Sequence, residues 1–142
     1  MASSGPVTDA RTTWLRTAIL FGLGYFLVGR LFAVPGEHAR AWRWAAWIVS
    51  FIAYAAHFQY ERIRFRNPPR SVALHVATAV AIGACAIAVA GMLHSIRAQG
   101  ALRPTWLLAI VLFPVVTAVP AFLVALVAAV ALSKRPERGS SG

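Results

Sequence analysis

Hydrophobic residues are gathered in four long runs separated by short polar connections. The runs cover about 15–34, 44–60, 72–96 and 107–132. An α-helix rises about 1.5 Å per residue, so runs of about 20 residues can cross a hydrocarbon core of about 30 Å. The third run alternates Ala with Val or Ile, but an isolated strand could not satisfy its backbone in lipid. We therefore predict an all-α integral membrane protein, folded as a four-transmembrane-helix bundle.

Proline and glycine mark the limits of these runs. Pro35 and Gly36 follow the first run, the pair Pro68 and Pro69 closes the second connection, and Pro104 precedes the fourth run as a first-turn proline. We predict a flexible N-terminal tail over 1–13, one transmembrane domain over 14–133 and a flexible C-terminal tail over 134–142. The first run exceeds the apolar region of a signal peptide, about 7 to 15 residues, so we interpret it as a span.

The charge is distributed as membrane topology requires. The chain has 59% hydrophobic and 13% charged residues and a net charge of +10. Its basic residues stand at the ends of the apolar runs, which argues against a nucleic-acid partner. Five basic residues lie on one side of the predicted bundle. Nine basic residues lie on the other side, which also holds both termini. Because the more basic side is normally cytoplasmic, we predict cytoplasmic N and C termini in a bacterial inner membrane. The nine residues are Arg11, Arg16, Arg62, Arg64, Arg66, Arg70, Lys134, Arg135 and Arg138.

Four of these arginines form a dense cluster between the second and third runs. Arg62, Arg64, Arg66 and Arg70 lie within nine residues. Each basic side chain near an anionic membrane surface contributes about 1 kcal/mol of attraction. We predict that the cluster anchors the topology and contacts anionic lipid headgroups, so that membrane lipids are partners of the chain.

The third run is rich in small residues, which let helices approach closely in lipid. Ala79 with Gly83, and Ala86 with Ala90, have the four-residue spacing of a helix-packing face. We expect this helix to be central in the bundle. The same feature favours a non-enzymatic protein that assembles with itself or serves as an accessory subunit of a membrane complex.

Embedded chemistry is scarce. All four acids, which are Asp9, Glu37, Glu61 and Glu137, fall at helix ends or in tails, and Cys85 is the single cysteine. The chain has the size and span number of small four-helix multidrug exporters and of glutathione-dependent membrane enzymes. It lacks the embedded carboxylate of the former and the charged helix motifs of the latter, so no family is assigned. No hydrolytic or nucleotide-binding motif is present, which makes an enzyme the less favoured interpretation.

Histidines supply the first alternative function. Tyr54, His57 and Glu61 stand at i, i+3 and i+7 on one helical face, and His75 lies at a similar depth in the next helix. Two such imidazoles could ligate haem iron or another metal, as in a redox membrane protein. The competing interpretation is that each histidine bonds a neighbouring backbone group or Glu61.

Prolines supply the second alternative. Pro114 and Pro120 interrupt the uncharged fourth run, and each should free a carbonyl one turn upstream that Thr117, a neighbouring helix or water must satisfy. A kinked helix can serve as a hinge, so a small transporter or channel stays open as a function.

Overall fold

The computed structural model describes residues 7–31 and 39–134, and in residues 7–12 the backbone alone. The described residues form four α-helices. Helix α1 covers Val7–Leu31, α2 covers Ala39–Phe65, α3 covers Pro69–Gln99 and α4 covers Pro104–Ser133. The predicted all-α fold is confirmed for this part of the chain.

Three of these helices are long and apolar enough to cross a membrane. They are the Thr13–Leu31 part of α1, the whole of α3 and the whole of α4. Helix α2 has 27 residues and therefore sufficient length, but Arg40 and Arg43 stand near its start and a charged stretch stands near its end. The membrane character predicted from the sequence is thus supported by three apolar helices, and the fourth span stays a prediction.

The helices are longer than the apolar runs that predicted them. Helix α1 begins at Val7, inside the stretch 1–13 predicted as a flexible tail. Neither glycine nor proline occurs between Pro6 and Gly22, so nothing in the sequence stops the helix from extending beyond the apolar residues. Helix α2 continues five residues past Tyr60. Residues 32–34 of the first predicted span and 135–142 of the predicted C-terminal tail lie outside the described residues.

The connections follow the proline and glycine signals. Pro68 caps α3, Pro69 begins it and Pro104 begins α4, where the missing N–H of proline costs no helical hydrogen bond. Gly100 ends α3 in a left-handed conformation, with φ of 69°, and its N–H donates to the Ile96 carbonyl. Arg66, in the connection between α2 and α3, is also left-handed, with φ of 47°.

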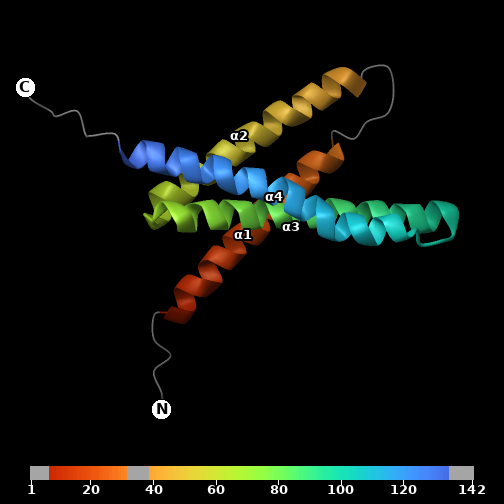
Figure 1. Ribbon diagram of the computed structural model, residues 1–142, viewed down its shortest axis with the longest axis horizontal. Helices are drawn as coiled ribbons and strands as arrows, with labels where there is room; N and C mark the ends of the chain where they lie inside the picture. Colours follow the sequence, from red (N-terminus) through yellow and green to blue (C-terminus); the bar gives the residue numbers. More distant parts are fainter. Residues whose placement is uncertain (1–6, 32–38, 135–142) are drawn as a thin grey trace, which may run out of the picture.

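Helix α3 is the centre of the arrangement. It packs against α1, α2 and α4, and with α4 it forms an antiparallel hairpin that α1 crosses obliquely (Figure 1). The beginning of α1, the α2–α3 connection and the end of α4 lie towards the same end of this hairpin. The prediction that the small-residue helix is central is confirmed.

Helices α1 and α3 approach each other closely where they cross. A Cβ atom added at Gly83 would stand 2.8 Å from the Tyr25 Cβ and 2.9 Å from the Gly22 carbonyl oxygen. Ala79, one turn earlier, is fully buried. The first predicted small pair therefore packs against α1. The second pair, Ala86 and Ala90, is only half-buried.

Two other small residues of α3, with the same four-residue spacing, are better buried than the second predicted pair. Ala84 and Ala88 are buried, whereas Ala86 and Ala90 are not. Spacing alone does not fix which of several overlapping small-residue faces is used, because the choice depends on where the neighbouring helices cross.

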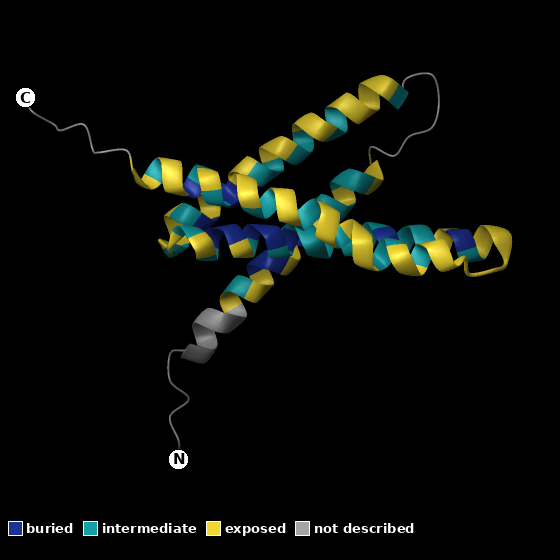
Figure 2. Ribbon diagram, viewed as in Figure 1, coloured by how far each residue is buried: buried dark blue, intermediate teal, exposed yellow. Residues whose placement is uncertain are grey.

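The core is concentrated at one end of the hairpin. Buried side chains of α2, α3 and α4 meet near the α2–α3 connection, where Figure 2 shows dark blue on α3. The other end exposes many large apolar side chains, as is expected of helices that face lipid. The core cluster consists of Phe58, Val72, Ala73, Val76, Ala125 and Ala129.

Candidate functional site

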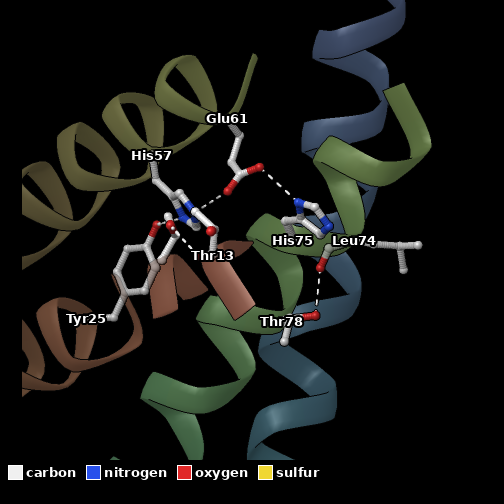
Figure 3. A network of polar contacts seen from close by, with 8 residues as sticks. Thr13, Tyr25, His57, Glu61, Leu74, His75 and Thr78 are labelled. Atoms are coloured by element: carbon white, nitrogen blue, oxygen red, sulfur yellow. Dashed lines mark hydrogen bonds and ion pairs between the residues drawn. The ribbon is translucent and has the colours of Figure 1, made fainter. Parts of the chain in front are cut away.

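A carboxylate lies between two imidazoles beside this core. Glu61 Oε2 is 2.9 Å from His75 Nδ1, and Glu61 Oε1 is 3.9 Å from His57 Nε2. Figure 3 shows the Glu61 side chain pointing into the space between the two rings. When the carboxyl group is ionised, His75 Nδ1 donates a hydrogen bond to it. The sequence-based alternative in which a histidine bonds to Glu61 describes His75, whereas His57 faces Glu61 without a hydrogen bond.

Local structure explains how the three residues meet. His57 and Glu61 are four residues apart, so they lie on one face of α2. Because α3 begins at Pro69 after a short turn, His75 comes back to the depth of Glu61 after less than two helical turns. His57 and His75 therefore lie at a similar depth, as predicted, and both face Glu61.

The burial of Glu61 changes the picture drawn from the sequence. Its side chain is 1% exposed and that of His57 is 0% exposed, whereas that of His75 is 19% exposed. Glu61 stands near the end of α2, as predicted, but the bundle encloses it. The cluster is accordingly closed at His57 and open to the surroundings at His75.

Helix α1 covers the cluster with aromatic rings. Trp14 stacks on His75 with ring centroids 4.8 Å apart, and Phe21 stacks on His57 at 3.8 Å. The Tyr25 hydroxyl lies 3.4 Å from His57 Nδ1. The cluster therefore joins three helices, and Tyr25 extends its polar contacts towards the middle of the bundle.

Two buried polar atoms in the cluster have no hydrogen-bond partner: His57 Nε2 and Glu61 Oε1. A buried polar group without a partner is costly, by about 1–3 kcal/mol, so each such group calls for an explanation. The two atoms face each other across 3.9 Å. A proton on either group, with a small side-chain movement or one water between them, would satisfy both atoms. The cluster is thus suited to holding and exchanging a proton.

The same geometry does not suit haem or a shared metal ion. The Glu61 carboxylate occupies the space between His57 and His75 that a shared metal would need. Among the described residues, no group of three or more His, Cys, Asp or Glu side chains has metal-binding geometry. The haem or metal alternative therefore stays a prediction.

Tyr54, which the sequence placed with His57, His75 and Glu61, contacts α4 instead. Its hydroxyl donates to the Ala121 carbonyl of α4 and does not reach the Glu61 cluster. It lines a crevice of about 560 Å³ between the four helices, to which Tyr25 also contributes. Tyr25 therefore connects the crevice to the cluster, since its hydroxyl lies beside His57.

The predicted hinge prolines lie within α4, and Pro120 lines the crevice. Proline has no N–H, so Pro120 cannot donate to the Val116 carbonyl, nor Pro114 to that of Ile110. The Thr117 hydroxyl contacts the Phe113 and Pro114 carbonyls at 2.9 and 3.1 Å. Thr117, one of the three partners considered for the freed carbonyls, thus bonds to the carbonyls of Phe113 and Pro114.

The arginine cluster divides in two. Arg62 donates from Nη2 to the Leu132 carbonyl at 3.1 Å, which satisfies a carbonyl of the last turn of α4. The other three predicted headgroup ligands, Arg64, Arg66 and Arg70, are exposed. These three are the side chains that stay available for lipid headgroups.

Sequence reasoning missed Tyr25, Trp14 and Phe21, all of which come from α1. Phe21 and Tyr25 are spaced by four residues on one face, but nothing in that pattern shows that this face meets α2. The chain matches no protein-family model, and searches of curated proteins and of solved structures gave no match. Function must therefore be argued from the site itself.

Proposed function

We propose that this chain is a small proton-coupled transporter of a bacterial inner membrane. The observation that carries the proposal is the enclosed carboxylate: Glu61 is 1% exposed, stands between His57 and His75, and keeps one oxygen without a partner. Ionisable groups buried in membrane proteins are expensive and mark proton or substrate pathways by default. The sequence argument against such a transporter was the lack of a carboxylate at membrane depth; the enclosure of Glu61 by the bundle now supports the proposal.

The proposed topology has four spans with both termini in the cytoplasm. Helix α2, with 27 residues, would cross beside the three more apolar helices. The basic residues at the α2–α3 connection would then face the cytoplasm, together with His75, the more exposed end of the cluster. The cluster would exchange protons with the cytoplasm by way of His75.

Transport through this cluster is tested with purified protein in liposomes. A pH gradient is imposed, and its collapse is followed with a fluorescent amine after addition of lipophilic cations, lipophilic acids or neutral aromatic compounds. We expect at least one compound to accelerate the collapse with the wild type and with Glu37→Gln, but not with Glu61→Gln. Equal rates for the wild type and Glu61→Gln would contradict the proposal.

A second candidate is an oligomeric or accessory subunit of a membrane complex. The observation that favours it concerns α2, the least apolar of the four helices. The first half of α2 nevertheless exposes a continuous row of large apolar side chains. A helix of marginal hydrophobicity gains from a protein neighbour in place of lipid. The exposed row consists of Trp44, Trp47, Ile48, Phe51 and Ile52.

Assembly is tested by measuring the mass of the protein in detergent and in native membrane extract. A stable oligomer, or a stoichiometric companion, that is lost on Ile48→Ala with Ile52→Ala would support a subunit. The matched control is Leu107→Ala with Leu108→Ala, which removes exposed apolar side chains from α4. A strict monomer in both media would count against the subunit proposal.

A further inference from the structure

The crevice between the helices carries an inference about the molecule that is transported. It has a volume of about 560 Å³, within the range of about 300–1,000 Å³ that small-molecule sites occupy. All four helices contribute to its walls, and none of the described side chains that line it is charged. The site would therefore take a largely apolar molecule of drug-like size.

Five aromatic side chains line this crevice, and they decide the charge of the occupant. Aromatic rings present electron-rich faces that attract organic cations. Val116 of α4 lines the crevice, and Pro120 lacks the N–H that would bond to the Val116 carbonyl in a regular helix. The Thr117 hydroxyl contacts carbonyls of its own helix and so offers no donor to a ligand. The aromatic set is Tyr25, Trp47, Phe51, Tyr54 and Phe113.

We propose that the crevice binds a lipophilic organic cation and that this cation competes with the proton held by the Glu61 cluster. Tyr25 lines the crevice, and its hydroxyl lies 3.4 Å from His57 Nδ1. The other ring nitrogen of His57 faces Glu61. A cation beside Tyr25 and a proton in the cluster therefore repel each other in a medium of low dielectric constant. This inference rests on the proposed transport function and names its substrate class.

The groups that set the charge of the cluster are few. Glu61 is faced by His57 on its own helix and by His75 on α3, while α1 contributes Tyr25 through His57. Arg62, next along α2, turns to the Leu132 carbonyl of α4. When the cation binds, one proton leaves the cluster for water by way of His75, so that charge is conserved in the exchange.

The test measures binding of tetraphenylphosphonium to the purified full-length protein by calorimetry at three pH values. We expect saturable binding whose affinity rises with pH, approaching tenfold per pH unit where one full proton is released. Glu61→Gln should bind with the same affinity at each pH. Absence of saturable binding, or a wild-type affinity that is independent of pH, would overturn the inference.

The position of the site is tested with a matched pair on α4. Val116 lines the crevice, whereas its exposed neighbour Val115 does not. Val116→Trp should fill the crevice and weaken binding at least tenfold, while Val115→Trp should change it less than twofold. Trp47→Leu, which removes an aromatic face without filling space, should also weaken binding. Equal affinities for the Val116 and Val115 variants would overturn the assignment.

Two further outcomes separate this inference from the transport proposal. If a lipophilic acid or a neutral compound collapses the pH gradient and tetraphenylphosphonium does not bind, the substrate class is wrong while transport through Glu61 stands. If the cation binds in the crevice and no compound collapses the gradient, the site is right and transport is wrong. A phospholipid that copurifies and is lost in Val116→Trp, but not in Val115→Trp, would identify lipid as the occupant and overturn the inference.

Discussion

The two halves of α2 show how differently one helix can be used. Its second half buries His57, Phe58 and Glu61 against α1, α3 and α4. Its first half exposes Trp47 at 74% and Phe51 at 71%, and diverges from α4 in Figure 1. Two ionisable side chains of α2, His57 and Glu61, thus lie in the protein interior while large apolar side chains of the same helix lie at its surface, which is consistent with a lipid surrounding.

This difference explains where chemistry and binding can occur. The closed half encloses a carboxylate and holds it against two imidazoles. The open half leaves a crevice between α2 and the other helices, bounded by aromatic side chains. A proton site and a ligand site are therefore neighbours, because the same helix packs tightly at one end and loosely at the other.

The largest effect is expected at the crossing that holds α1 on α3. Gly83→Leu would bring a side chain against the Tyr25 Cβ and the Gly22 carbonyl, neither of which can move without displacing a helix. We expect a loss of about 1–3 kcal/mol in the free energy of unfolding, or more, measured as a lower melting temperature in detergent. Gly24→Leu is the control, since no atom lies within 4 Å of a Cβ added there. Equal losses for both variants would show that the crossing is not tightly packed.

A smaller loss is expected when the buried carboxylate is removed. Glu61→Leu leaves the partly buried His75 Nδ1 group without its acceptor, at a cost of up to about 1–3 kcal/mol. Glu61→Gln keeps an acceptor oxygen and should cost less. Denaturation of both variants in the same detergent tests this order. Trp47→Ala lies in the exposed half of α2 and should cost less stability than Glu61→Leu. Equal losses in the free energy of unfolding would contradict the contrast drawn between the two halves.

The smallest effect is expected for the exposed arginines. Arg64→Gln with Arg70→Gln should leave the melting temperature unchanged and weaken association with anionic headgroups by about 1 kcal/mol per arginine. The measurement is the retention of anionic lipid by the purified protein, compared with neutral lipid. Arg62→Gln should instead lower the melting temperature, because Arg62 bonds to the end of α4. Identical behaviour of the two sets would contradict this division of the arginine cluster.

The sequence by itself determined the helices. Long apolar runs, proline at the helix starts and Gly100 at the end of α3 act locally, because each depends on a few neighbouring residues and on the cost of unpaired backbone in lipid. The central position of α3 was also readable, since small residues are what close helix packing requires. The sequence did not show that α1 and α2 extend beyond the apolar runs, because polar helix ends look like loops in a hydropathy pattern.

Only the tertiary structure decided what Glu61 and Tyr54 do. Both stand on the same predicted face of α2, yet Glu61 meets His75 on α3 and Tyr54 meets the Ala121 carbonyl on α4. Periodicity states which residues share a face and leaves open which neighbour that face meets along its length. Because α2 crosses its neighbours obliquely, residues two turns apart contact different helices. The enclosure of a carboxylate that the sequence places at a helix end therefore depends on helix crossing, which no local pattern records.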